Sequence, residues 1–541
     1  MGRAGIKAAR LAAAENETVR AALLSNHVNP EDAFMAAVPL AKRRMRGQFF
    51  TPAPIANLMA EWVCAKKPAR ILDPTAGTGV LLRAVKDYAP NAQITAYEID
   101  AMAAEMALAH TPGVDVRVAD FLQSGDETFD AVIANPPYVR HHDINGGAAV
   151  MKDLSARTGV AFSGLSNIYV AFIVRCFEAL KDGGRAGVLV PTEWANANFG
   201  EALKTYLRTR DALRGVIWFS HSGAIFEGNL STACILLMEK SARAEKRVRG
   251  WFVDGANVGS FAALERIAAP RTFTADELYG ARKWNGLFEH GASALQDGFV
   301  PLSDLAATMR GLATGANGFF HLSAEDAAHA GISAAHLSPC VGRASDVAGL
   351  MFTGDDFAAL EARGKRTRLV DLCGALSDAE AAYVKRGEDD GLPARYLLGA
   401  RTPWYAQERR TPAPIWAAVF GRTSMRFILN AAGVHSLTTF HGIYPKDNRA
   451  EFAKALCACL NSEAVQEMSR AERRVYGGGL SKFEPRDVLN IPVPDLRSAD
   501  ARTLQNLCAA FDNLVREDTT QTRAALNDAT LNTAQFSGDA S

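Results

Sequence analysis

The stretch Phe129-Asp130-Ala131-Val132-Ile133-Ala134-Asn135-Pro136-Pro137-Tyr138 decides how the rest of the chain is interpreted. Its first six residues form an apolar run, which predicts a buried strand of a parallel sheet. The two prolines end that strand, because neither can donate a hydrogen bond to a neighbouring strand. An amide side chain, free carbonyls and an aromatic ring therefore stand at the carboxyl end of a strand, the edge at which open α/β sheets bind ligands.

The last four residues suit methylation of an amino group attached to an aromatic ring. Such a nitrogen is a poor nucleophile because its lone pair is delocalised into the ring. The side-chain carbonyl of Asn135 and the main-chain carbonyl of Pro136 could each accept one N–H and draw the nitrogen towards tetrahedral geometry. Tyr138 would stack on the flat face of a base that has left its helix. The alternative is a plain turn after a strand.

Three further strands are predicted before this loop, and each ends in an acid. They cover residues 70–73, 93–97 and 114–118 and end at Asp73, Glu98 and Asp120. The turn that follows Asp73, residues 74–79, contains two glycines and leads into a helix, which brings the backbone close to a nucleotide-like ligand. Glu98 could accept hydrogen bonds from two ribose hydroxyls, and Asp120 from an adenine amino group. Each acid taken alone can be explained as a helix cap. Helix capping does not explain why three successive strands all end in an acid.

The segment Gly47-Gln48-Phe49-Phe50-Thr51-Pro52 precedes the first of these strands. Thr51 as N-cap and Pro52 in the first helical position predict the start of a helix. Capping does not require the Phe49-Phe50 pair, which is explained either by core packing or by a ligand. Residues 1–46 are predicted to be helical and close with a basic cluster, residues 42–46, which is either a phosphate contact or a solvated face.

Length and composition limit the class of protein. A chain of 541 residues predicts two to four domains. Basic and acidic residues balance at 59 each, so a nucleic-acid partner would have to meet a local basic surface. None of the eight cysteines forms a Cys-x-x-Cys pair, which argues against disulfides and zinc and favours the cytoplasm; we also expect no other metal site. No signal peptide or membrane-spanning run is recognised.

The second half of the chain carries two patterns that suit contact with nucleic acid. Residues 308–320 are rich in glycine and small polar groups, which allow a close approach to a phosphodiester strand or, alternatively, form a hairpin. Residues 395–410 interleave arginines with aromatic residues, a pattern that suits phosphate contact and base stacking. The polar stretch from about Thr519 is expected to be flexible.

The motif order Gly-Gln-Phe-Phe-Thr-Pro, Asp-Pro-Thr-Ala-Gly-Thr-Gly, Glu-Ile-Asp, Asp-Phe, Asn-Pro-Pro-Tyr resembles that of the adenine-specific (N6) DNA methyltransferases of bacterial restriction–modification systems. It is similar to their gamma arrangement, in which the cofactor half comes first and the recognition domain last. The resemblance implies a Rossmann-like α/β domain of the class I S-adenosylmethionine-dependent methyltransferases, with a mixed seven-stranded sheet. A C-terminal α+β target-recognition domain would follow it.

The resemblance also assigns roles residue by residue. It implies that S-adenosyl-L-methionine is held by Phe49, Phe50, Thr51, Asp73, Ala76, Gly77, Gly79, Glu98, Asp120 and Phe121. Phe49, Phe50 and Thr51 would lie against its methionine part, Glu98 would hold the ribose, and Asp120 with Phe121 the adenine. The catalytic loop would consist of Asn135, Pro136, Pro137 and Tyr138. Phe226 would stack on the other face of the target base, although core packing explains it equally well.

The resemblance and the composition shifts together predict five segments. They are a helical basic extension at 1–46, the methyltransferase domain at 47–250, a connection at 251–300, the target-recognition domain at 301–500 and a C-terminal helix with a flexible tail at 501–541. The expected partner is double-stranded DNA, with a separate cognate restriction endonuclease as a further one and a monomeric or dimeric state. A bacterial cytoplasmic location, with the enzyme bound to the nucleoid through DNA, is implied.

Two other functions fit parts of the pattern. One is methylation of a protein glutamine or of an RNA amino group, since such enzymes carry the same four-residue loop or a close relative of it. They usually lack so long a C-terminal half. The other is a catalytically silent DNA-recognition subunit, against which the intact loop at Asn135–Tyr138 and the intact glycine turn both argue.

Overall fold

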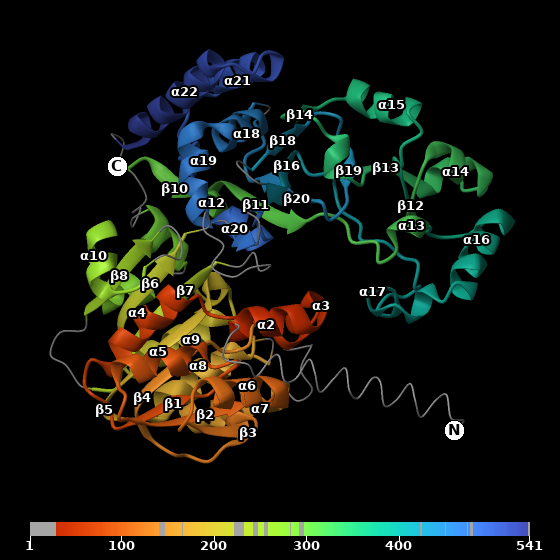
Figure 1. The fold of residues 1–541 in the computed structure, drawn as a ribbon. Coiled ribbons are helices and arrows are strands. Elements are labelled where there is room, and N and C mark those ends of the chain that lie inside the picture. The colour runs from red at the N-terminus through yellow and green to blue at the C-terminus, as the bar shows by residue number, and fades with distance from the viewer. Residues whose placement is uncertain are drawn as a thin grey trace, which may run out of the picture. The chain divides into compact units, whose positions relative to one another are not determined.

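The computed structural model describes residues 29–139, 147–164, 166–220, 232–241, 247–253, 258–281, 283–290, 297–421, 425–449, 451–472, 474–476 and 480–538. Its contacts divide the chain into two compact units. The first comprises Met1–Ala292 and Val475–Gly479, and the second Ser293–Arg474 and Leu480–Ser541. Figure 1 shows the helices and strands of both units, which are described separately below.

A nine-stranded sheet forms the centre of the first unit, in the order β3-β2-β1-β4-β5-β7-β6-β8-β9. Its strands are β1 (Arg70–Asp73), β2 (Gln93–Glu98), β3 (Asp115–Val118), β4 (Phe129–Ala134), β5 (Leu180–Pro191), β6 (Leu213–Phe219), β7 (Ala233–Glu239), β8 (Arg247–Val253) and β9 (Arg271–Thr274). Strands β1 to β5 are parallel, and β7 runs antiparallel to both of its neighbours. The predicted α/β class and the four predicted strands that lead to the Asn-Pro-Pro-Tyr loop are confirmed.

The sheet has two strands more than the seven that were expected. Strand β8 pairs with β6 and β9 pairs with β8, so the sheet extends into the segment 251–300 that was interpreted as an irregular connection. The burial of β8 alternates only in part, because Gly250 interrupts it between Val248 and Trp251. A seven-residue strand with this pattern gives a weak periodic signal.

Helices cover both faces of this sheet. They are α2 (Pro30–Ala37), α3 (Leu40–Arg46), α4 (Ala53–Cys64), α5 (Val80–Tyr88), α6 (Ala101–His110), α7 (Gly147–Thr158), α8 (Tyr169–Glu178), α9 (Gly200–Thr209), α10 (Phe261–Ile267) and α11 (Ala275–Gly280). Val132 of β4 belongs to the core cluster that contains α8, whereas its neighbour Ile133 belongs to the cluster that contains α4. Burial on both faces explains why β4 is a continuous apolar run rather than an alternating one.

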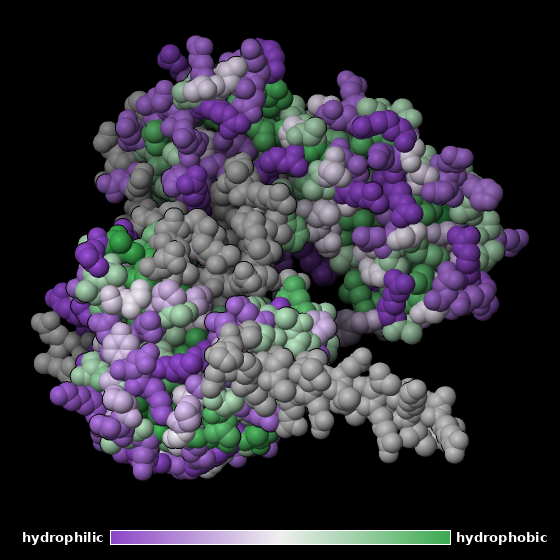
Figure 2. Space-filling view, viewed as in Figure 1, coloured by the Kyte–Doolittle hydropathy of each residue, from purple (hydrophilic) through white to green (hydrophobic). Residues whose placement is uncertain are grey.

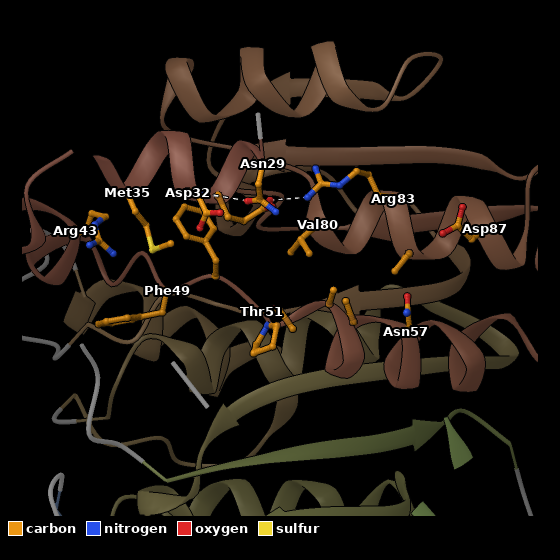
Figure 3. Close-up of a pocket in the computed structure, with 16 residues that line it drawn as sticks. Asn29, Asp32, Met35, Arg43, Phe49, Thr51, Asn57, Val80, Arg83 and Asp87 are labelled. Carbon is orange, nitrogen blue, oxygen red and sulfur yellow. Dashed lines mark hydrogen bonds and ion pairs between the residues drawn. The ribbon is translucent and has the colours of Figure 1, made fainter. Parts of the chain in front are cut away.

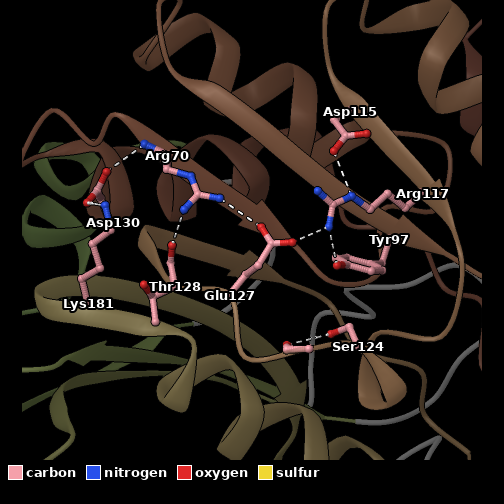
Figure 4. Close-up of polar contacts among 10 residues, drawn as sticks. Arg70, Tyr97, Asp115, Arg117, Ser124, Glu127, Thr128, Asp130 and Lys181 are labelled. Carbon is pink, nitrogen blue, oxygen red and sulfur yellow. Dashed lines mark hydrogen bonds and ion pairs between the residues drawn. The ribbon is translucent and has the colours of Figure 1, made fainter.

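Ion pairs join the strands near the start of β1 and β5. Figure 4 shows Glu127 between two guanidinium groups: it accepts from Arg70 at 3.0 Å and from Arg117 at 2.8 Å. The hydrogen bond from Arg117 lowers the pKa of the Glu127 carboxyl. Asp130 accepts from the Arg70 main-chain nitrogen at 2.8 Å and from Lys181 at 2.8 Å. Through these two acids, β1 is connected to both β3 and β5.

The basic cluster at residues 42–46 contributes contacts within the first unit. Arg43 is buried and its Nε donates to the carbonyl of Val38 at 3.1 Å, while Arg46 forms an ion pair with Asp100. Phe34 of α2 and Val38, which follows α2 directly, also join the core, since both pack on α6. Arg43 and Arg46 of this cluster therefore form contacts within the protein, so the cluster is not simply a solvated face.

The second unit contains a five-stranded sheet, a four-stranded sheet and shorter pairings, together with helices. Its strands are β10 (Phe299–Pro301), β11 (Ala306–Arg310), β12 (His321–Leu322), β13 (Leu337–Val341), β14 (Met351–Phe352), β15 (Arg368–Val370), β16 (Ile415–Ala418), β17 (Phe420–Gly421), β18 (Phe427–Asn430), β19 (His435–Ser436), β20 (Phe440–Pro445), β22 (Leu480–Lys482) and β23 (Pro492–Pro494). Its helices are α12 (Leu302–Leu305), α13 (Asn317–Phe320), α14 (Ala324–His329), α15 (Gly354–Ala362), α16 (Asp378–Asp389), α17 (Tyr396–Gly399), α18 (Phe452–Asn461), α19 (Glu463–Ser469), α20 (Pro485–Leu489), α21 (Ala501–Arg516) and α22 (Thr520–Gly538).

Three arginines of the interleaved stretch brace the glycine-rich segment. Arg395 donates to the carbonyl of Gly315 at 3.3 Å, Arg401 to that of Ala313 at 2.6 Å, and Arg410 to that of Arg310 at 2.6 Å. Burial lowers the pKa of Arg401. Two of these carbonyls, those of Ala313 and Gly315, lie outside the strands, and the third belongs to Arg310 at the end of β11. The guanidinium groups thus have a structural role that their spacing in the sequence does not reveal.

Most of the C-terminal stretch that was expected to be flexible forms helix α22, Thr520–Gly538. Helix α22 buries Leu526, Thr530 and Ala534, which recur every four residues on one face. Only the first of the three is a large apolar residue, so the stripe is thin and the sequence looks polar. Figure 2 shows mainly hydrophilic residues on the visible surface over α21 and α22, as expected of helices that bury one face.

Candidate active site

A cavity of about 640 Å³ brings the predicted motifs together at the carboxyl ends of β1, β2 and β4. Of the predicted site residues, its lining includes Phe49, Phe50, Thr51, Ala76, Gly77, Glu98, Asp120, Phe121, Asn135 and Pro137. Such a volume is typical of sites for small molecules and cofactors. Motifs that lie up to 88 positions apart in the sequence therefore form a single site.

Asn135 stands at the end of β4 with both hydrogens of its amide nitrogen engaged. Its Nδ2 donates to the main-chain carbonyl of Phe49 at 2.9 Å and to Thr51 Oγ1 at 3.0 Å. A carbonyl can only accept a hydrogen bond, so the amide nitrogen must be the atom that faces Phe49. The remaining polar atom, Oδ1, is an acceptor.

Tyr138 is half-buried beside Asn135 and is held by three contacts. Its hydroxyl donates to the carbonyl of Leu189 at 3.3 Å, its ring lies at 26° to that of Phe49 with centroids 5.9 Å apart, and its ring meets Tyr169 at 83°. Burial raises the pKa of Tyr138 well above its usual range. The phenol is therefore neutral and brings no charge to this site. Pro136, between the two residues, is buried.

Glu98 joins the second strand to the glycine turn. One carboxylate oxygen accepts from the main-chain nitrogen of Gly77 at 2.8 Å and the other from that of Asp100 at 2.9 Å. An ionised carboxylate offers about four lone-pair positions. Glu98 can therefore accept two further hydrogen bonds from a ligand while it holds the turn in place.

Asp120 and Phe121 form another part of the wall. Asp120 accepts from the main-chain nitrogen of Leu122 at 2.9 Å and from Gln123 at 3.0 Å, so it does cap the short helix that follows. Phe121 is buried, and its ring packs on Phe172 with centroids 6.2 Å apart. The capping role and a ligand contact are compatible, because both residues also line the cavity.

Two predicted cofactor residues lie outside the cavity lining. Gly79 has a φ of +92°, and a Cβ there would stand 3.2 Å from the Cα of Ala107, so this glycine allows α5 to pack against α6. Asp73 is fully buried and accepts from the Thr75 main-chain nitrogen at 3.0 Å, while its Oδ2 has no hydrogen-bond partner among the described residues. Both residues therefore support the glycine turn without lining the cavity.

Asp73 provides a test of this arrangement by pH. Burial raises its pKa to about 7, against ~3.9 in an unfolded chain. The folded protein therefore binds one proton more than the unfolded chain between these values, so its stability should fall as the pH rises through that window and level off above about pH 7. We expect the Asp73→Asn protein to lack this slope. Melting temperatures of both proteins from pH 5 to 8 measure it, and parallel curves would contradict the assignment.

Thr51 does not have the role that its position suggested. Helix α4 begins at Ala53 with Pro52 as N-cap and no side-chain capping bond, so the prediction of Thr51 as N-cap is wrong. Its hydroxyl accepts from Asn135 instead, 84 residues away in sequence. A contact at this sequence distance has no local signal.

Sequence reasoning also missed apolar groups of the cavity. Phe34 and Met45 come from α2 and α3, Phe172 from α8, and Ile99, which is 68% exposed, follows Glu98 directly. The sequence did contain a signal for Ile99, because an isoleucine between two acids at the end of a strand is an unusual place for a large apolar residue. Phe226, by contrast, lies outside the described residues.

A second cavity, of about 550 Å³, shares Phe49, Phe50 and Thr51 with the first. Figure 3 shows residues of its other walls, which come from α2, α3, α4 and α5. Arg83 of α5 forms an ion pair of 2.6 Å with Glu31 of α2. Thr78 also donates to Glu31 at 2.6 Å. The carboxylate of Glu31 thus ties α2 to the glycine turn.

Two kinds of feature are absent from the described ranges. No group of three or more histidine, cysteine, aspartate or glutamate residues in them could hold a metal ion. No helix within them is both long enough and apolar enough to cross a lipid bilayer.

Comparisons with known proteins give one consistent answer for both units. The family model for N-6 DNA Methylase matches residues 32–269, and the model for the C-terminal domain of type II methyltransferase M.Eco57I matches residues 292–531. Type II methyltransferase M.AccI of Acinetobacter calcoaceticus is 30% identical over 508 residues, which cover 90% of this chain and 92% of that protein. Type II methyltransferase M.XamI of Xanthomonas campestris pv. amaranthicola is 29% identical and covers 86% of this chain and 88% of that protein.

Among solved structures, the chain is similar to one titled as a cryoEM structure of a DrdV–DNA complex, with a TM-score of 0.51, 11% identity and coverage of 91% of this chain and 61% of that one. At this identity the likeness concerns the fold alone. The matches to M.AccI and M.XamI extend over nearly the whole chain and include both halves. This chain belongs to the N-6 DNA methylase family and is a type II, S-adenosylmethionine-dependent N6-adenine DNA methyltransferase of the restriction–modification kind.

Proposed function

We propose that the enzyme methylates N6 of an adenine that has flipped out of double-stranded DNA, and that the chemistry takes place at the amide of Asn135. One observation carries this proposal: Asn135 lines the same cavity as Glu98 and Asp120, the two acids suited to a nucleoside. An acceptor for an amino group and a nucleoside site in one cavity are what such a transfer requires.

The residues of the cavity fit S-adenosyl-L-methionine. That molecule supplies an electrophilic methyl group. Glu98 would accept from its ribose hydroxyls with the lone pairs that Gly77 and Asp100 leave free, and Asp120 would accept from its adenine amino group. Ile99 and Phe121 would border the adenine ring, since both line the cavity and Ile99 is exposed. Phe49 and Phe50 would enclose the methionine part.

The target adenine would meet a neutral, apolar and acceptor-rich surface. Its N6 amino group would donate one hydrogen bond to Asn135 Oδ1 and one to the carbonyl of Pro136, which aims the nitrogen lone pair at the methyl group. The base would stack on the face of the Tyr138 ring that is turned away from Phe49. Phe226 remains a proposed partner on the opposite face of the base.

We further propose that residues 301–500 form the target-recognition domain. The match of residues 292–531 to the C-terminal domain of a type II methyltransferase supports this assignment. Tyr396, which is 96% exposed beside the brace of Arg395, is available for the base stacking that the interleaved pattern suggested. The role would be protective modification, and a separate endonuclease of the same specificity would be the partner enzyme.

Transfer of labelled methyl from S-adenosyl-L-methionine to unmethylated genomic DNA tests the function directly. The modified positions would be mapped by single-molecule sequencing. N6-methyladenine confined to one short motif is the expected result. Label in RNA or protein but not in DNA would refute the DNA substrate and favour one of the alternative substrates. A folded protein that binds the cofactor but labels none of them would refute the proposed function altogether.

The role of Glu98 has its own test. We expect Glu98→Gln to weaken S-adenosylmethionine binding by about 10- to 100-fold, the range for charged hydrogen bonds, because an amide NH2 would face a main-chain N–H that it cannot accept from. Calorimetry measures the Kd. Glu265→Gln, at an exposed acid of α10 that pairs with Arg249, is the matched control and should leave the Kd unchanged. Equal affinity of the Glu98→Gln and wild-type proteins would remove Glu98 from the cofactor site.

A further inference from the structure

We propose that Thr51 is a positioning residue, whose hydroxyl sets the orientation of the Asn135 amide and so presents Oδ1 to the target amino group. The inference rests on the proposed function. It replaces the two roles that the sequence suggested for Thr51, a helix cap and a contact to the methionine part of the cofactor.

The amide nitrogen of Asn135, Nδ2, carries two hydrogens. The Phe49 carbonyl takes one of them at 2.9 Å, and this bond alone decides which way round the amide lies. A single bond still allows the amide plane to swing about it. The second acceptor, Thr51 Oγ1 at 3.0 Å, fixes that plane and leaves no N–H of the amide free.

Neither acceptor can move easily. Thr51 is 3% exposed. The ring of Phe49 is stacked on that of Tyr138. The segment 46–51, which carries Phe49 and Thr51, is anchored at Arg46 by an ion pair with Asp100. Gln48 also approaches Asp100, at 3.5 Å. The acceptors are thus part of a short rigid segment, which a positioning role requires.

The consequence for chemistry is selectivity for a donor. With both N–H groups of Asn135 engaged inside the protein, the amide can offer only an acceptor to a substrate. An exocyclic amino group satisfies that acceptor, whereas a ring carbonyl would be repelled by it. Loss of the Thr51 hydroxyl would release one N–H and let the amide rotate away from the reactive geometry.

The test compares Thr51→Val, which keeps the shape and removes the oxygen, with Thr51→Ser, which keeps the oxygen. We expect Thr51→Val to lower kcat for methyl transfer about tenfold, the value of one hydrogen bond of ordinary strength. The Kd for S-adenosylmethionine should stay within about twofold. Thr51→Ser should restore kcat. Melting temperatures of both variants report on folding.

A double-mutant cycle with Asn135→Ala separates positioning from structure. If Thr51 acts through Asn135, Thr51→Val should have no further effect on single-turnover rates once Asn135 is alanine. A full tenfold loss in that background would overturn the inference, as would a Thr51→Val protein with the wild-type kcat. If Thr51→Val weakens cofactor binding and leaves kcat unchanged, the inference is also wrong, and Thr51 instead contacts the methionine part of the cofactor. Failure of the wild-type protein to label DNA is a different result, because it refutes the proposed function instead.

Discussion

Asn135→Ala should lower kcat for DNA methylation about 10³-fold, the effect typical of removing a preorganised polar group from a reacting centre. The change deletes Oδ1, the proposed acceptor for the target amino group, and leaves only the carbonyl of Pro136. The Kd for S-adenosylmethionine should change less than about threefold, since Glu98 and Asp120 are the residues proposed to hold the cofactor. Single-turnover methyl transfer and calorimetry on the same preparations measure the two effects.

The matched control for this variant is Asn57→Ala. Asn57 lies on α4 and lines the second cavity, so the same chemical change is made in the same unit away from Asn135. Its kcat should equal that of the wild type. A loss of cofactor affinity by Asn135→Ala that parallels its loss of kcat would show that Asn135 belongs to the cofactor site and not to the reacting centre.

Gly47→Ala should reduce kcat about 100-fold, although residue 47 itself reacts with nothing. A Cβ at Gly47 would stand 2.5 Å from the main-chain nitrogen of Tyr138 and 2.7 Å from a methyl group of Val139. Either the catalytic loop or the segment 47–51 must then shift, which breaks the contacts of Asn135. A displacement of about 1 Å in a reacting group can cost on the order of 10²-fold in rate.

Gly47 also has a φ of +64°, so any side chain there adds backbone strain of about 1 kcal/mol. Gly159→Ala controls for the strain, because Gly159 has a φ of +74° and nothing within 4 Å of its Cβ position. Both variants should melt at a lower temperature than the wild type, but only Gly47→Ala should lose kcat when assayed well below its melting point. Equal kcat values for the two variants would separate Gly47 from the catalytic loop.

The strands that lead to the active site could be predicted because each carries a local signal. Strand β4 buries both faces, so its apolar run is continuous, and the prolines after it end the ladder unambiguously. The acids at the tips of β1, β2 and β3 follow from the same logic. The assembly of their motifs around one cavity confirms that the carboxyl ends of parallel strands meet at one edge.

Other features had no local signal. The hydroxyl of Thr51 has an equally good partner in a helix N-terminus and in the Asn135 amide, and only the fold brings the second one close. The arginines at 395, 401 and 410 donate to main-chain carbonyls, and every residue offers a carbonyl, so the sequence cannot point to the partner. Strand β8 buries two consecutive residues, Gly250 and Trp251, which interrupts the alternation that marks a strand.

The arginine braces of the second unit have a consequence for how such an enzyme acquires a new recognition sequence. Arg401 donates to the carbonyls of Ala313 and Thr314 and to Gln407, and Arg410 donates to the carbonyl of Arg310 and to Glu408, so both have fewer N–H groups left for a bidentate contact with guanine than Arg395, which makes one such bond. Substitution there would loosen the loop for every DNA sequence alike. In the recognition domain proposed for residues 301–500, a change of specificity would therefore use the side chains that the braced loop displays rather than the braces themselves.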